Sequence, residues 1–380
     1  LDVGEAVSVF YLCNGADGED SEGPINYWGE SEESPFTYDG DLSFSHFGEM
    51  LAFCGSYVAI DGNLTINSTL LTHTEDLECL EAISGDIRIE SNSRLELIRF
   101  ENLKVLGGGI TISDNSMLDS VIFDSLIHTN TSVLIQNHEN LKSVQMPTLE
   151  FIGFDFLEDG DFLLYNNPSL HDLRMETLEV IQNDFVIDNS GLVDISGLDM
   201  LTHVGDGFQL SNNAVLETLS SLISFERTGL DFRITDNPIL LNIDGLSGFY
   251  FVGGGLEIQN NEQLQSINLP SLDYIGSSSG MTVNSNPLLQ VLLTPALYTI
   301  YGDIWIEYND TLSIIDIGAL KASNGIFISN NAVLTGVDLS ALLEVSDIDF
   351  SDNAALTSLS LGALDIATNI QITNNLLLQS

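Results

Sequence analysis

The sequence predicts an all-β fold, a right-handed parallel β-helix or solenoid of about 13 coils with roughly 22 to 25 residues each. Two observations support this prediction. A short pattern, apolar-x-apolar-x-x-Asn-x-x-Leu, recurs along the chain, for example in FRITDNPIL, LEIQNNEQL and IFISNNAVL. A second apolar string follows in each unit, such as the run from Leu264 to Ile275, so each unit has several inward-facing corners. Because an internal repeat outweighs length as evidence for domain number, we interpret the 380 residues as one repeat array.

Each apolar-x-apolar alternation predicts a short strand with one face turned inward, and stacked coils then form parallel sheets. The spacing is regular apart from one longer step between His138 and Asn167, which contains the acidic and aromatic stretch from Phe154 to Gly160. We expect residues 154–160 to bulge from one coil as a loop. Loops on solenoid faces often bind partners.

The most regular polar residue of the repeat is an asparagine that follows each strand. Because a buried polar group needs hydrogen-bond partners, an inward asparagine in every coil predicts a stacked ladder that binds backbone groups where the chain leaves the strand. His138 and Ser190 fill two slots of this ladder. The expected ladder asparagines are Asn92, Asn115, Asn167, Asn213, Asn237, Asn261, Asn286, Asn309, Asn331, Asn353 and Asn375.

The first 53 residues differ from the repeat. They are acidic, rich in turn-forming residues and sprinkled with aromatic residues, as in GADGEDSEGPINYWGESEESPFTYDGD. We expect residues 1–53 to cap the first coil, since an exposed terminal coil would show apolar core and unpaired strand edges. Residues 54–380 are then the continuous solenoid, and the interruption at Ser380 inside a repeat leaves a continuation beyond it open.

The start of the solenoid, FCGSYVAIDGNLTINSTLLTHTEDLECLEAISGDIRI, resembles the receptor L-domain family through its two cysteines and the Leu-x-Cys-x-x-Ile-x-Gly run. This family includes the ligand-binding lobes of insulin and growth-factor receptors and fungal wall proteins of the Ecm33 and Sps2 kind, which are closest in style to this chain. The resemblance covers residues 54–380 and implies a bond between Cys54 and Cys79, and stacked coils would also bring residues one turn apart together. The ligand residues of the receptors have no counterpart here.

Cys13 is left without a partner, which predicts either an intermolecular bridge or a buried thiol. The bridge, the near-absence of lysine and three glycosylation sequons outside the ladder favour a secreted address at a cell surface or in a matrix. These sequons begin at Asn63, Asn67 and Asn130. A fourth, at Asn309, occupies a ladder slot and is expected to carry no glycan.

Charge excludes one class of partner. Nine Lys and Arg residues face 56 Asp and Glu residues, for a formal charge of -47, so no basic surface is left to neutralise the phosphates of a nucleic acid. No apolar run is long enough to span a membrane, so we expect no direct membrane insertion in this segment.

We find no sequence support for catalysis or a tightly bound cofactor. The six histidines are never paired on one strand, and no nucleophile elbow, phosphate-binding loop, dinucleotide fingerprint or calcium loop is present. Neighbouring acidic coils could bind Ca²⁺ weakly through Asp347, Asp349 and Asp352. Ordinary surface acid is the better interpretation of these three residues.

The outward residue in the middle of each repeated strand forms a column, which we call the outer column. It is not a threonine ladder, so ice binding is not predicted. Its apolar members Leu134, Leu163, Val186, Trp305 and Phe327 predict either contact patches on an exposed sheet or packing beneath loops. The column contains Arg88, Thr111, Leu134, Leu163, Val186, Gln209, Arg233, Glu257, Thr282, Trp305, Phe327, Asp349 and Gln371.

Two functions fit these features. The first is a non-enzymatic structural protein of a cell surface, wall or matrix, which assembles head-to-tail with copies of itself into filaments through open sheet edges. The second is a receptor-type ectodomain that binds a protein or glycan, with Trp305 and Phe327 as aromatic anchors. Enzyme activity is not expected.

Overall fold

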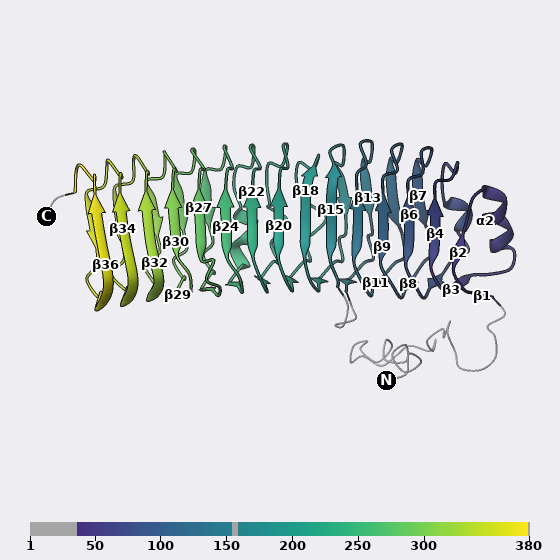
Figure 1. Cartoon of the computed structure of the whole chain (residues 1–380), viewed down its shortest axis with the longest axis horizontal. Helices are drawn as coiled ribbons and strands as arrows, with labels where there is room; N and C mark the ends of the chain where they lie inside the picture. The colour runs from purple at the N-terminus through teal and green to yellow at the C-terminus, as the bar shows by residue number, and fades with distance from the viewer. Residues whose placement is uncertain (1–35, 154–158, 379–380) are drawn as a thin grey trace, which may run out of the picture.

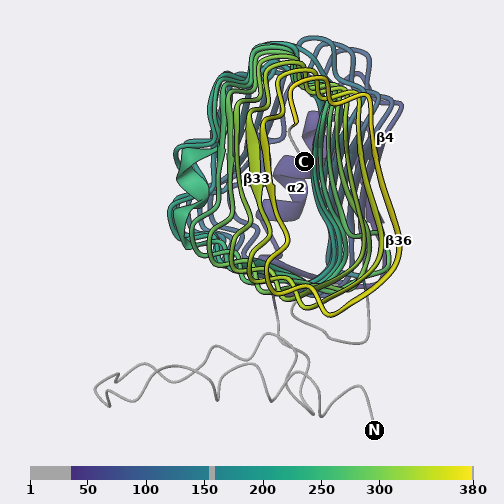
Figure 2. The same ribbon diagram turned by 90° about the vertical axis from the view of Figure 1, so that its left-hand side faces the viewer.

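The structure, a computed structural model, describes residues 36–153 and 159–378 and is an all-β parallel solenoid of about 14 turns, as predicted from the repeat. Figure 1 shows the coils lying side by side in one long row, and Figure 2 shows the same coils nearly superposed along the axis. The strands of successive coils pair in parallel and in register.

The largest sheet has 27 strands and contains two kinds of strand from each coil. Short strands lie at the first corner: β1 (Thr37–Asp39), β3 (Ala59–Asp61), β5 (Ala82–Ile83), β8 (Val105–Leu106), β11 (His128–Thr129), β14 (Phe151–Ile152), β17 (Val180–Ile181), β19 (His203–Val204), β21 (Arg227–Thr228), β23 (Phe251–Val252), β26 (Tyr274–Ile275) and β29 (Thr299–Ile300). The main strands follow: β2 (Leu42–Ser43), β4 (Leu64–Asn67), β6 (Ile87–Glu90), β9 (Ile110–Ser113), β12 (Val133–Gln136), β15 (Phe162–Asn167), β18 (Phe185–Ser190), β20 (Phe208–Ser211), β22 (Phe232–Thr235), β24 (Leu256–Gln259), β27 (Met281–Asn284) and β30 (Ile304–Glu307). In the last three coils the two kinds merge into β32 (Ala322–Ser329), β34 (Glu344–Ser351) and β36 (Ile366–Thr373).

Two smaller parallel sheets form a second face of the solenoid. One has four strands, β7 (Leu97–Phe100), β10 (Ser120–Phe123), β13 (Ser143–Gln145) and β16 (Asp172–Arg174). The other has five, β25 (Ser266–Asn268), β28 (Val291–Leu293), β31 (Ile314–Asp316), β33 (Gly336–Asp338) and β35 (Ser358–Ser360). The short 3₁₀ helix η3 (Asp244–Gly248) lies in the stretch of chain between these two sheets.

The N-terminal end of the solenoid begins before residue 54. Strands β1 and β2 pair in parallel with β3 and β4, so residues 37–43 already contribute to the first rungs of the main sheet. Helix α2 (Phe47–Cys54) then lies across this end of the solenoid, as Figures 1 and 2 show. It buries Met50 and Phe53 in the core. A disulfide joins Cys54 to Cys79, close to the 3₁₀ helix η2 (Glu75–Leu77), and ties α2 to the next coil. The expected pairing is therefore present. Cys13 lies outside the described residues.

Most of the predicted insertion, residues 154–158, also lies outside the described residues. Its flanks, Gly153 and Gly160, pass so close together that a Cβ atom on Gly153 would lie 2.4 Å from the Cα atom of Gly160. Gly153 also has a φ of +80°, which favours glycine. Both glycines are needed to bring the two ends of the insertion back to one coil.

The core is a single column of apolar side chains that runs through all the described coils. Its middle contains a stack of phenylalanines from the first inward position of four successive strands. The ring centroids of Phe162 and Phe185 are 5.6 Å apart, those of Phe185 and Phe208 4.8 Å, and those of Phe208 and Phe232 5.0 Å. Since parallel strands lie about 4.8 Å apart, in-register aromatic residues stack directly on one another.

The ladder residues lie inside the solenoid and link each coil to the next. In the coil of Asn261, the side-chain Oδ1 accepts the backbone N–H of Asn237 at 3.1 Å, and Nδ2 donates to the carbonyl oxygens of Ile234 and Gln259. The backbone N–H of Asn261 donates in turn to Oδ1 of Asn286. The ladder asparagines from Asn92 to Asn353 are at most 1% exposed, whereas Asn375 in the last described coil is partly exposed. Each amide thus satisfies backbone groups that no strand pairing reaches.

A left-handed backbone conformation is also repeated once in each coil, one residue before the ladder position. The repeat pattern of the sequence did not predict it. The residue directly before each ladder slot, and Ser68 before Thr69 one coil earlier, adopts a positive φ between 53° and 64°. Apart from Tyr308, these residues are Asn, Asp or Ser, and short polar side chains such as Asn and Asp tolerate this left-handed conformation best. The positions are Ser68, Ser91, Asp114, Asn137, Asn166, Asn189, Asn212, Asp236, Asn260, Ser285, Tyr308, Asn330, Asp352 and Asn374.

Replacing a ladder asparagine is expected to destabilise the solenoid. Asn261→Ala removes the acceptor of the Asn237 N–H and leaves buried carbonyl groups without a donor, which should lower the free energy of unfolding by about 3 kcal/mol. Gln263→Ala is a matched control, because Gln263 is an exposed amide in the same coil. Chemical denaturation of both variants measures the difference, and equal stability of the two would contradict the structural role of the ladder.

His138 makes the ladder sensitive to acid. Its ring lies between Asn115 and Asn167, with Nδ1 3.0 Å from Oδ1 of Asn167, and burial lowers the pKa of His138 from 6.5 to about 4. Between these two pKa values the unfolded chain binds a proton that the folded chain does not bind. Stability should therefore fall as the pH drops from about 6.5 to 4, by roughly 3 kcal/mol in all.

Denaturation at several pH values measures this effect, with His138→Asn as the informative variant. An asparagine restores the usual ladder residue, so this variant should lose less stability over the same pH range. His171→Asn serves as the control, because His171 is exposed. An identical pH dependence in the wild type and His138→Asn would refute the assignment.

Candidate functional site

The outer column exists as predicted, because each of its members is the register partner of the next along the main strands. Its five apolar members do not form one patch. Leu134, Leu163 and Val186 occupy adjacent coils, and Val186 is only 8% exposed. Trp305 and Phe327 lie further along, beyond four coils that carry polar side chains in this column. The structure therefore separates an aliphatic group, of which Leu134 and Leu163 stay partly exposed, from an aromatic pair.

Trp305 on β30 and Phe327 on β32 form a stacked pair on the outside of the sheet. Their ring centroids are 4.0 Å apart and the planes differ by 9°. The ring of Phe327 leans over Gly325, where a Cβ atom would lie 2.4 Å from the phenylalanine Cε2. Gly325 thus provides the space that lets the ring lie against the sheet and stack on the indole. Both aromatic side chains stay partly exposed.

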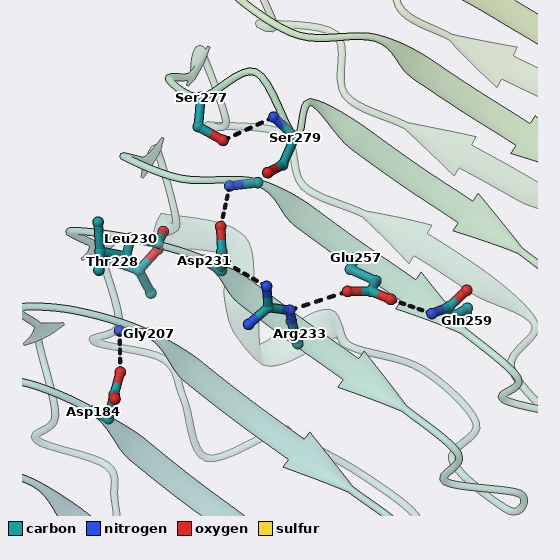
Figure 3. Close-up of polar contacts among 11 residues, drawn as sticks. Asp184, Gly207, Thr228, Leu230, Asp231, Arg233, Glu257, Gln259, Ser277 and Ser279 are labelled. Carbon is teal, nitrogen blue, oxygen red and sulfur yellow. Dashed lines mark hydrogen bonds and ion pairs between the residues drawn. The ribbon is translucent and has the colours of Figure 1, made fainter.

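A charged cluster lies on the same face, on strands β22 and β24 (Figure 3). Arg233 Nη2 is 2.5 Å from Asp231 Oδ2, and Arg233 Nε donates to Glu257 Oε2 at 3.1 Å. The other oxygen of Asp231 accepts the backbone N–H of Gly255, and the other oxygen of Glu257 contacts the Gln259 amide. All four carboxylate oxygens are therefore engaged.

A shallow hollow of about 50 Å³ opens beside this cluster. Gly255 and Gly280 on two successive coils line it, at positions where an added Cβ atom would collide with Ser279 and with the backbone of Asp303. Arg233 lines one side, and Thr282 continues the floor toward β30. Since Thr282 is the register partner of Trp305, the hollow ends where the aromatic pair begins. The remaining lining residues are Asp231, Leu256, Glu257 and Ser279.

A larger hollow of about 460 Å³ lies beside the disulfide and is strongly acidic. The one arginine in its lining is Arg99. Its Nε donates to Oδ2 of Asp124 at 2.8 Å, and its Nη1 lies 4.0 Å from Oε1 of Glu75. The hydrogen bond to Asp124 raises the pKa of Arg99 further above its usual value. His73 in its lining contacts Phe47, with ring centroids 4.8 Å apart and ring planes tilted by 36°. Nδ1 of His73 is buried and has no hydrogen-bond partner.

The structure does not bring the three calcium candidates together. Each is bonded to an amide of the following coil: Asp347 to Asn369 at 2.6 Å, Asp349 to Gln371 at 3.2 Å, and Asp352 to Asn374 at 2.9 Å. Across the part of the chain that the structure describes, no group of three or more His, Cys, Asp or Glu side chains is arranged to hold a metal ion. Within residues 36–153 and 159–378, no helix is long and apolar enough to cross a membrane.

The glycosylation candidates differ in exposure. Asn67 is exposed at the end of β4. Asn63 is engaged on both sides, since its Nδ2 donates to Asp41 and its Oδ1 accepts the N–H of Asp86. Asn130 is partly buried, and its Oδ1 atom has no hydrogen-bond partner. Asn309 is 0% exposed.

Secretion from a eukaryotic host should therefore yield protein with a glycan at Asn67 and none at Asn309, because a glycan on the buried ladder amide cannot be accommodated in the folded coil. Glycopeptide mass spectrometry measures the occupancy of each site. Folded, secreted protein with a glycan at Asn309 would overturn the inward placement of that residue.

Comparisons with known proteins add little to this geometry. No family model matches the chain, and no curated protein matches it. Among solved structures, the chain is similar to a chain in the crystal structure of a TLR13–ssRNA13 complex, with 12% sequence identity and a TM-score of 0.24. The match covers 90% of this chain and 66%, just under two thirds, of that chain. The resemblance to the receptor L-domain family therefore stays a prediction.

Proposed function

We propose that this chain is a non-enzymatic extracellular recognition scaffold, in which a rigid solenoid presents its long sheet face to a protein or glycan ligand. The main support is the stacked pair of Trp305 and Phe327, which lies on the outer face of the sheet and remains partly exposed. Rigid aromatic side chains contribute a large share of the binding energy at recognition sites. The pair also lies outside the core that holds the coils together.

The solenoid suits this role because its outer residues are fixed by the core beneath them. The inward neighbours of Trp305, Ile304 and Ile306, are fully buried, and β30 pairs with strands on both sides. Sites on paired strands keep their geometry better than sites on loops. The outer face is therefore preorganised for a ligand.

An extracellular location is part of the proposal. The bond between Cys54 and Cys79 is typical of proteins that fold in an oxidising compartment. The sequon at the exposed Asn67 fits the same route. Membership in the receptor L-domain family would agree with both features. The structural role in a wall or matrix, with head-to-tail assembly of copies, stays a prediction.

Array binding tests the proposed function. The secreted protein is applied to protein and glycan arrays next to Trp305→Ala and a control, Ile223→Ala, which changes an exposed apolar residue elsewhere on the solenoid. We expect at least one ligand to bind the wild type and the control equally, and Trp305→Ala to bind it about tenfold more weakly. The proposal fails if no ligand binds, or if Trp305→Ala binds as well as the wild type.

A further inference from the structure

We infer that the open sheet surface above Thr282, between Trp305 and the hollow, is a subsite for one pyranose ring of a neutral glycan. This inference rests on the proposed recognition function and names its ligand class. It starts from the orientation of the aromatic pair. Because the two rings are nearly parallel and belong to register partners on adjacent strands, Phe327 covers one face of the indole. The other face of the indole is turned toward the coil of Thr282.

The space next to the free face of the Trp305 indole, above the coil of Thr282, is about as wide as one ring is thick. A ring stacked on an aromatic face lies at a centroid separation of about 4.5–7 Å, and adjacent strands lie about 4.8 Å apart. A ring stacked on Trp305 would therefore sit above the coil that carries Thr282 and Gly280. These residues have a short side chain and no side chain, and both line the hollow. A larger side chain at position 282 would occupy the same space.

The polar groups around this space suit hydroxyl groups. Thr282 and Asn284 point outward from β27, and Glu257 and Gln259 occupy the next strand at the same two levels. The Thr282 hydroxyl and Nδ2 of Asn284 can bond sugar hydroxyls, and Oδ1 of Asn284 already accepts the N–H of Glu307. The Glu257 carboxylate is bonded to Arg233 and Gln259 and can only accept further hydrogen bonds. An aromatic face next to such groups matches a pyranose, which has an apolar face of C–H bonds and a rim of hydroxyls.

The charge of the hollow selects a neutral ligand. Asp231 and Glu257 outnumber Arg233, so an anionic sugar would be repelled. A cation is also disfavoured, because the Arg233 guanidinium lies between these carboxylates and already engages both of them. A ligand therefore meets one net negative charge, carried by carboxylates that are already bonded to the arginine. A chain of neutral hexose or N-acetylhexosamine units fits this balance.

Fluorescence can observe the subsite directly. The chain has two tryptophans, so Trp28→Phe leaves Trp305 as the only indole. This background protein is titrated with chito-, cello- and laminari-oligosaccharides, with oligogalacturonate as an anionic probe and a short arginine-rich peptide as a cationic probe. We expect a neutral oligosaccharide to change the Trp305 emission in a saturable way, and the charged probes to have no effect.

Three variants test whether the sugar binds in the space above Thr282, which we call the Trp305 slot, or elsewhere on the sheet. Calorimetry measures binding in the variant that lacks the indole. Trp305→Ala and Thr282→Trp should each weaken binding about tenfold or more, the first by removing the stacking face and the second by filling the slot. Phe251→Ala should bind as the wild type, because Phe251 stacks on Tyr274 in a different column of the sheet. Thermal unfolding confirms that all three variants are folded.

Two results would overturn the inference. If no neutral oligosaccharide binds at millimolar concentration, or if binding survives Thr282→Trp, the surface above Thr282 is not a pyranose subsite. If the arrays identify a protein ligand that depends on Trp305 while the sugars fail, the sugar inference falls and the proposed recognition function stands. If binding to neutral sugars is lost in both slot variants and kept in Phe251→Ala, the inference holds.

Discussion

The solenoid depends on one constraint, which is that each coil must satisfy the backbone groups it buries where the chain turns away from the main sheet. Strand pairing cannot satisfy them, because the chain leaves the strand at that point. A carboxamide can, since it offers an acceptor and two donors from one short side chain. In the coil of Asn261 the amide oxygen accepts from the coil before, and Nδ2 donates to the coil before and to the coil itself. The backbone N–H of Asn261 donates to the coil after. The regular spacing of the chain follows from this need.

Substitutions in the ladder show how strict the constraint is. Ser190 fills its slot by bonding its hydroxyl and its N–H to Asn213 Oδ1, at 2.7 Å and 3.0 Å. A serine lacks the amide donors, so this coil makes fewer bonds to the strand before it. His138 keeps a donor and an acceptor only while its ring is neutral. Both exceptions adjoin the irregular part of the array, where the long step from His138 to Asn167 interrupts the repeat.

Much of the fold was predictable from the sequence, because in a solenoid the repeat length equals the path around one coil. The inward placement of Asn309 and the alignment of Arg233 with Glu257 follow from the period alone. The rungs at residues 37–43 were not predicted, since strands of three and two residues carry no repeat signature. The positive φ at Asn260 and its equivalents had a signal, the short polar residue before each ladder slot.

The candidate site was predictable only in part. Trp305 and Phe327 were recognised as outward residues, but their stacking depends on Gly325, where a Cβ atom would collide with the phenylalanine ring. A pattern of apolar residues does not show where a missing side chain, as at Gly325, gives an aromatic ring room. The in-register pairing of strands in successive coils has a broader consequence for how such a chain can evolve. Because each coil contacts mainly its neighbours, gain or loss of a whole coil elsewhere would lengthen or shorten the array without disturbing the local arrangement around Trp305.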